Sequence, residues 1–213
     1  YKVILGPDIT FLYPFDLSDR IKKGVAINLR NWPWWDSELY SKKDEIFRKI
    51  DRKFPNFKFF YPFKKWSPDN FINEINKELI KVVPLPLYFG TYDISDHEYL
   101  SKYFSKVSKG NQIDALKKYH LLIGMRLHSI IFATQLGLPF ISLSYEPKNE
   151  SYCADLRHPE LSVKLKDWDD VFKKVKYVEN RYAEIRNDLI TYTYGSNIQA
   201  KQIFHKIKIL MNK

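Results

Sequence analysis

The sequence contains little cysteine and no long apolar run, and both shortages exclude classes of protein. A single cysteine, Cys153, leaves no internal disulfide framework and no cysteine-cluster zinc site, and it fits a reducing, cytoplasmic compartment. No apolar run approaches the roughly 18 residues that a membrane-spanning helix needs. The opening residues, YKVILGPD, have neither a basic start nor a long apolar region, so we expect no signal peptide.

Glycine is also scarce, with 7 among 213 residues, and the common glycine-rich motifs are missing. The sequence has no G-x-G-x-x-G, no Walker A motif and no G-x-S-x-G. Gly124 has no glycine partners nearby, so it does not form a phosphate-binding loop. Four of the histidines lack metal-like spacing, so we expect no metal site and no bound cofactor: His97, His120, His158 and His205.

What the chain has in excess is positive charge. Its formal net charge is +10 and its pI is about 9.4, which suits an anionic partner such as nucleic acid, a membrane surface or a phosphorylated metabolite. A lysine-rich, solvated surface would give the same charge, because the basic residues are spread along the whole chain. The sequence has no arginine-rich block, C2H2 pattern or RNP-like aromatic motif, so we expect no nucleic-acid partner.

The patterning predicts an α/β fold, and the 45% hydrophobic content is enough for a real core. Near-continuous apolar runs that alternate with helices predict a Rossmann-like, mostly parallel sheet with helices on both faces and a helical C-terminus. The expected strands are residues 3–6, 24–29, 57–63, 121–125, 140–145 and 161–165, with extended chain at 84–90. The expected helices are residues 38–53, 68–82, 95–107, 111–119, 128–136 and 149–157, then 167 almost to the end with a break near 194–197.

Three of the expected strands end in polar or charged residues. In an open α/β sheet, ligands bind beyond the carboxyl ends of the strands, so we expect these side chains to converge on one anion. The helix that begins near the histidine would add its positive N-terminal end. Taken singly, each residue also fits an ordinary solvated or packing role. The three pairs are Asn28 and Arg30, Arg126 and His128, and Glu146 and Lys148.

A tryptophan-rich cluster, WPWW at 32–35, has two readings. It fits either a sugar-stacking platform or a hydrophobic plug, and the plug is slightly favoured.

An ordered set of motifs resembles the polysaccharide pyruvyl transferase family. The specific part reads Gly124-Met125-Arg126-Leu127-His128, then Gly137-Leu138-Pro139, then Tyr145-Glu146-Pro147-Lys148, each beside an apolar strand. Two flanking features agree with it: the "PD-x-x-F" pattern within residues 6–11, and the strand within residues 23–30. The resemblance covers most of the chain, although only residues 121–148 are specific.

The resemblance implies half of a fold similar to that of GT-B glycosyltransferases, which have two Rossmann-like domains around a cleft. Residues 1–19 would be the tail of a first domain or a linker, and residues 20–213 the domain that carries the donor site. The family moves pyruvate from phosphoenolpyruvate onto a sugar as a ketal and releases phosphate. The acceptor would be a sugar, a polysaccharide or a lipid-linked glycan, with association at the inner face of a membrane left open.

By the same resemblance, Arg30, Arg126 and Lys148 would bind phosphoenolpyruvate, and His128 would be the general acid. Asn28 and Glu146 would support them. These residue types suit the chemistry, because arginine offers bidentate forks to a carboxylate and a phosphate. An imidazolium can deliver a proton to the enol methylene carbon near neutral pH.

Two other functions stay open at this point. A GT-B glycosyltransferase would use the same crevice for a nucleotide sugar, and a non-catalytic domain would bind an anion or a glycan there. A chain that carries one half of the cleft could also bind the donor and yet be inactive alone. Binding of phosphoenolpyruvate, of a nucleoside diphosphate or of neither separates these functions.

Overall fold

The computed structural model describes residues 6–13, 17, 24–31, 68–78, 82–90, 95–107, 109–110 and 112–211. Four expectations lie outside these residues: most of the strand at 3–6, the WPWW cluster at 32–35, the helix at 38–53 and the strand at 57–63. The described residues include the ends of all three strands that carry the candidate site residues.

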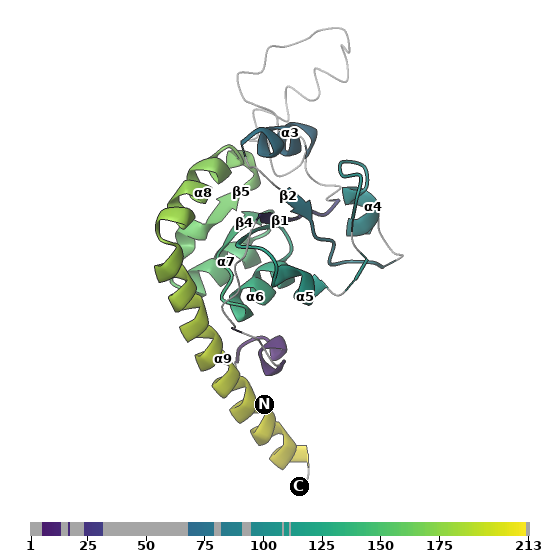
Figure 1. The fold of residues 1–213 in the computed structure, drawn as a ribbon. Helices are drawn as coiled ribbons and strands as arrows, with labels where there is room; N and C mark the ends of the chain where they lie inside the picture. The colour runs from purple at the N-terminus through teal and green to yellow at the C-terminus, as the bar shows by residue number, and fades with distance from the viewer. Residues whose placement is uncertain are drawn as a thin grey trace, which may run out of the picture.

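The centre of the fold is a five-stranded parallel sheet in the order β2-β1-β3-β4-β5 (Figure 1). Every residue of the three central strands is buried, as their near-continuous apolar runs predicted. The register pairs Ala26 with Leu122 and Ile123 with Ile141, so the predicted α/β fold with a parallel sheet is confirmed. The strands are β1 (Val25–Asn28), β2 (Val82–Pro84), β3 (Leu121–Gly124), β4 (Phe140–Ser144) and β5 (Ser162–Lys164).

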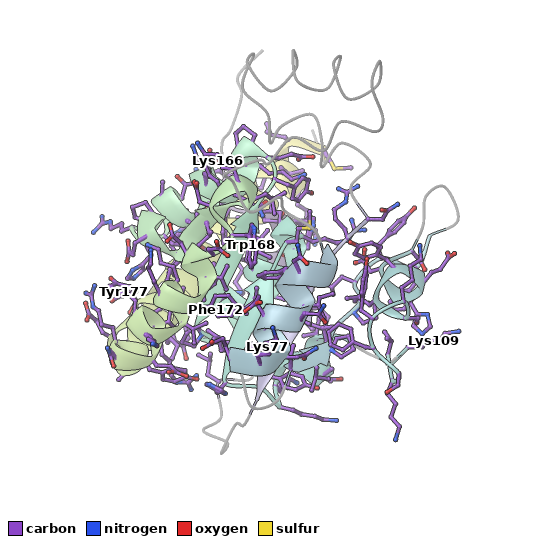
Figure 2. All side chains as sticks on the ribbon, turned by 90° about the horizontal axis from the view of Figure 1, so that it is seen from above. Lys77, Lys109, Lys166, Trp168, Phe172 and Tyr177 are labelled. Carbon is purple, nitrogen blue, oxygen red and sulfur yellow. The ribbon has the colours of Figure 1, made fainter. Side chains whose placement is uncertain are left out.

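Helices cover both faces of this sheet. On one face lie α3 and α8, and Figure 2 shows them with Trp168 labelled. Phe71 of α3 meets Trp168, which lies two residues before α8, edge-on with 5.7 Å between the ring centres. On the other face lie α5 and α6, and α9 runs along the side of the sheet and past it (Figure 1). The helices are α3 (Pro68–Glu78), α4 (Asp96–Leu100), α5 (Gln112–Leu116), α6 (Leu127–Gln135), α7 (Pro147–Asp155), α8 (Asp170–Asn180) and α9 (Tyr182–Met211). Short 3-10 turns are η1 (Ile9–Leu12), η2 (Pro159–Leu161) and η3 (Leu165–Asp167). No helix in the described part of the chain is both long enough and apolar enough to cross a membrane.

The C-terminal helix differs from the sequence expectation. The predicted break near 194–197 is wrong, because α9 is continuous from Tyr182 to Met211. Thr193, in the turn before Gly195, is buried, and its hydroxyl donates to Thr134 O of α6 at 2.9 Å. One glycine destabilises a helix by about 1 kcal/mol relative to alanine, and this packing outweighs that cost. Two helix ends also differ: α4 ends at Leu100, earlier than predicted, and Val82, the predicted end of the helix from residue 68, begins β2.

Two glycines test the fold in opposite directions. Gly137 follows α6 at φ 54°, and an added Cβ there would lie 2.7 Å from Ile190 Cγ1. We therefore expect Gly137→Ala to lower the free energy of unfolding by about 1–3 kcal/mol.

Gly195 has open space where a Cβ would stand. Gly195→Ala should raise stability by about 0.5–1 kcal/mol, because alanine favours the helix. Urea unfolding measures both changes, and a destabilising Gly195→Ala would contradict an unbroken α9.

Candidate functional site

The site lies at the carboxyl edge of the sheet, where β1 and β3 are neighbours. The chain leaves β1 toward β2 on one side and leaves β3 toward β4 on the other, so the strand order reverses between them. Open α/β sheets form a ligand crevice at such a switch point. Asn28 ends β1, and Arg126 follows β3 by two residues, so both lie at this point.

Asn28 ties together three segments at this edge. Its side chain is buried, and its amide nitrogen donates to Leu85 O at 2.9 Å, just after β2. Its amide oxygen accepts from the backbone N–H of Arg126 at 3.1 Å, just after β3. The amide nitrogen also lies 3.3 Å from an oxygen of Asp96. Asn28 therefore holds the ends of β1 and β3 and the chain after β2 together, and its role beside a bound donor stays a prediction.

Asp96 was not predicted as a site residue, and its carboxylate is buried at this edge. Its side chain has no exposed surface. Its carboxylate accepts from the backbone N–H groups of Leu87 and Tyr88, both at 3.1 Å, as well as from Asn28. These bonds offset the cost of burying a carboxylate, but a buried anion also needs a nearby cation.

Arg126 is that cation. Its Nε and Nη2 donate to the two oxygens of Asp96 at 2.6 and 2.5 Å, and its Cζ lies 4.9 Å from the centre of the Tyr88 ring. The side chain is 20% exposed, so one edge of the guanidinium is held by protein and another remains near the surface. A guanidinium has five N–H donors, and the bonds to Asp96 use two of them. Arg126 is thus fixed in place while keeping donors for an anion.

Arg30 and Lys148 meet on one aromatic ring. Arg30 Nη1 donates to the Tyr145 hydroxyl at 3.0 Å, and its Cζ lies 5.1 Å from the ring centre. Lys148 Nζ lies 5.5 Å from the same centre and forms a 2.5 Å ion pair with Glu146. Burial is the largest influence on the pKa of Lys148 and acts to lower it, but the hydrogen bonds and electrostatic interactions with Glu146 and Tyr145 together outweigh it, so the pKa is raised above the ordinary lysine value. Lys148 is therefore a cation at neutral pH.

His128 has contacts of a different kind. It lies in the first turn of α6, its side chain is 58% exposed, and its ring lies 6.1 Å from that of Phe132. Its ionic partner is Asp8, with 3.8 Å between Nε2 and Oδ2. The structure thus joins Asn28 with Arg126, and Arg30 with Lys148 through Tyr145. It gives His128 a partner from outside the predicted set.

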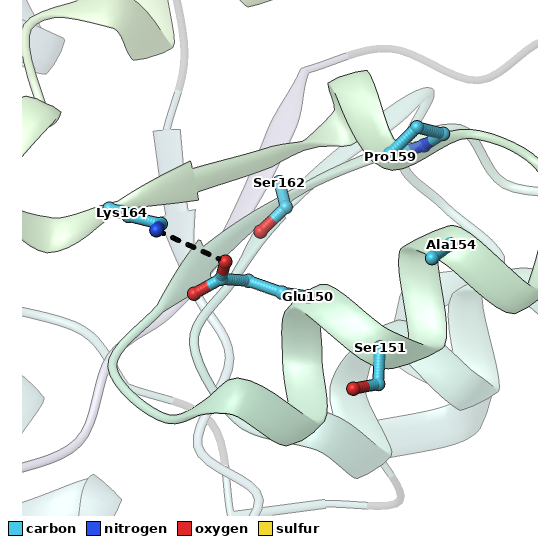
Figure 3. A pocket seen from close by; sticks show the side chains of 6 residues that line it. All are labelled: Glu150, Ser151, Ala154, Pro159, Ser162 and Lys164. Carbon is cyan, nitrogen blue, oxygen red and sulfur yellow. Dashed lines mark ion pairs between the residues drawn. The ribbon is translucent and has the colours of Figure 1, made fainter.

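A pocket lies between α7 and β5, as Figure 3 shows. Glu150 Oε2 and Lys164 Nζ form an ion pair of 3.4 Å within it. Ser144, at the end of β4, donates to Glu150 Oε1 at 3.2 Å and to Glu146 O at 3.0 Å. The pocket is therefore connected to the turn that carries Glu146 and Lys148. Its lining consists of Glu150, Ser151, Ala154, Pro159, Ser162 and Lys164.

Other reactive side chains serve the fold. His158 is buried between Glu160 at 2.9 Å and Asp188 at 3.1 Å, which links η2 to α9. Cys153 is buried, and burial raises the pKa of its thiol to about 12, so it is protonated at neutral pH. Within the described ranges, no three His, Cys, Asp or Glu side chains are arranged to hold a metal ion.

Comparison with known proteins gives one finding. A family model described as "Polysaccharide pyruvyl transferase" matches residues 1–147. The matched range contains Arg30, Arg126 and His128 and ends one residue before Lys148. No curated protein and no solved structure gives a significant match.

The buried ion pair can be tested by its effect on stability. Asp96→Ala would leave Arg126 without its carboxylate and Leu87 and Tyr88 without an acceptor. We expect it to lower the free energy of unfolding by about 3–5 kcal/mol, the usual cost of breaking a buried pair. Glu98→Ala, two residues away on the exposed side of α4, is the matched control and should change stability by less than about 0.5 kcal/mol. Equal effects of the two variants in urea unfolding would show that Asp96 does not hold this edge together.

Proposed function

We propose, because the chain belongs to the polysaccharide pyruvyl transferase family, that it transfers pyruvate from phosphoenolpyruvate onto a sugar of a polysaccharide or glycan as a ketal. Phosphate would be the other product. The observation that supports this most is the placement of Arg30, Arg126 and Lys148 at one sheet edge, around Tyr145 and the β1–β3 switch point. Three cations suit a donor that carries a carboxylate and a phosphate.

Donor binding would draw on two kinds of cation. Arg126 is held by a fully buried carboxylate, so its free N–H groups are already oriented before a ligand arrives. Lys148 is 46% exposed and its partner Glu146 is 28% exposed. Such a partly exposed ion pair is worth at most about 1 kcal/mol, so a phosphate or carboxylate can replace Glu146 at little cost. Arg30 would contribute a second planar fork.

The reaction would begin with a proton from the His128 imidazolium to the methylene carbon of phosphoenolpyruvate. The carbon that carries the phosphate would become electrophilic, and one sugar hydroxyl would add to it and lose its proton. Loss of phosphate and addition of the second hydroxyl would complete the ketal. Acid catalysis of this kind is typically worth about 10²–10⁴-fold. The donor is a co-substrate, and the reaction as proposed uses no bound cofactor.

The acceptor is proposed at the level of the family alone: a hydroxyl-rich glycan, free or attached to a lipid. The net charge of +10 would favour an acceptor that carries phosphate or lies at an anionic membrane surface. The proposed setting is the cytoplasm, including the inner face of a membrane. Residues 20–213 remain predicted as the donor domain of a GT-B-like fold.

Calorimetry with phosphoenolpyruvate tests the donor site. We expect binding by the wild type, and about 10-fold to 100-fold weaker binding by Arg30→Met and by Lys148→Met, because each loses a charge-assisted contact. His128→Gln should bind almost as well as the wild type, because its role is proton transfer. The control is Arg181→Met, which removes an exposed arginine between α8 and α9 that is paired with Glu184.

The other outcomes are equally informative. Binding of a nucleoside diphosphate without binding of phosphoenolpyruvate would replace the proposal with a glycosyltransferase. Salt-sensitive binding of an anionic glycan, with no binding of either donor, would indicate a non-catalytic domain.

A further inference from the structure

We infer that Asp8 is a positioning residue that orients the imidazole of His128. The two residues are 120 positions apart in the sequence, yet Oδ2 of Asp8 lies 3.8 Å from Nε2 of His128. The inference rests on the proposed function in one respect, namely that His128 supplies the proton. It makes the segment around η1 part of the active site.

The carboxylate of Asp8 is oriented by the turn that it caps. Asp8 is the N-cap of η1, and its Oδ1 accepts from Thr10 N at 2.8 Å. Capping occupies one oxygen and leaves Oδ2 directed to His128. The side chain is 31% exposed, so its charge is only partly screened by water. The position of the carboxylate is therefore determined by the backbone of η1 and not by a flexible surface side chain.

The turn itself is anchored to the body of the protein. Phe11 is 1% exposed and meets the ring of Tyr192 edge-on at 5.9 Å. Asn197 donates from its side chain to Phe11 O. Both partners belong to α9, and Ile131 of α6 packs in the same cluster. Because α6 also carries His128, one small core holds both members of the pair.

The other titratable groups in this cluster remain neutral. Tyr152 of α7 and Tyr192 of α9 pack against the cluster that holds Phe11. Burial raises the pKa of both phenols, so neither carries a charge at neutral pH. Among the described residues, Asp8 is the acidic side chain that forms an ion pair with His128.

This pairing would serve an acid by orienting its ring. With Nε2 turned toward Asp8, Nδ1 would be left to face the donor. In nucleophilic catalysis a general base is oriented by a third group in a similar way. As an exposed ion pair, Asp8 and His128 would contribute little to the stability of the fold.

The test compares Asp8→Asn with Asp170→Asn in the full chain. The asparagine amide in the first variant would keep an oxygen that can accept from Thr10 N, so the cap survives while the charge is lost. Asp170 is paired with exposed Lys173 in α8 and serves as the control. The first readout is calorimetry with phosphoenolpyruvate. We expect Asp8→Asn to bind the donor as well as the wild type, because Asp8 acts on the ring of His128 and not on the donor. Loss of donor binding overturns the inference.

The second readout is exchange of solvent deuterium into the methylene group of phosphoenolpyruvate. We expect Asp8→Asn to slow it about 5-fold without changing donor affinity, and to slow it no further in the His128→Gln background. Equal slowing in both backgrounds means that Asp8 acts only on the structure, and it overturns the inference. If His128→Gln itself leaves the exchange unchanged, the proposed function fails. If His128→Gln slows the exchange and Asp8→Asn does not, the inference alone is overturned.

Discussion

The ion pair between Asp96 and Arg126 is the constraint on which the sheet edge depends. A carboxylate with no exposed surface would cost several kcal/mol without a partner, so Asp96 and Arg126 stabilise the fold only together. Through Asn28 and the N–H groups of Leu87 and Tyr88, the pair connects β1, the chain after β2, and the turn between β3 and α6. A single buried network therefore determines both the local structure and the direction of the arginine.

The cations around this network differ in how firmly they are held. Arg126 is fixed by a buried partner, whereas Lys148 shares a partly exposed ion pair with Glu146. Tyr145 brings Arg30 and Lys148 together, because both cations contact the same ring. A site with one rigid arginine and one exchangeable lysine can recognise an anion without a large rearrangement. Glu146 also neutralises part of the positive charge at this edge.

Much of the sheet and part of the site could be predicted from the sequence. The runs that became β1, β3 and β4 are nearly all apolar, because both of their faces are covered. The carboxyl ends of strands in a parallel sheet also share one edge. That is why Asn28 and Arg126 were predicted to be neighbours. Asp96 was missed because its sequence context, Ser95-Asp96, reads as the start of an exposed helix. Its role depends on a contact 30 residues away.

The remaining differences also come from tertiary contacts. Asp8 stood within the "PD-x-x-F" pattern, but the sequence could not show that α9 would bring it to His128. The expected break near Gly195 failed because packing against α6 outweighed local propensity. The division at residues 19 and 20 stays a prediction.

A crystal structure of the chain with phosphoenolpyruvate would test the central claim most directly. We expect Arg126 to keep both bonds to Asp96 while its remaining N–H groups contact the ligand, and Lys148 to exchange Glu146 for a ligand oxygen. The methylene carbon should then face His128. A ligand bound away from the β1–β3 switch point, or an Arg126 that leaves Asp96 to reach it, would contradict the claim that the buried pair builds the donor site.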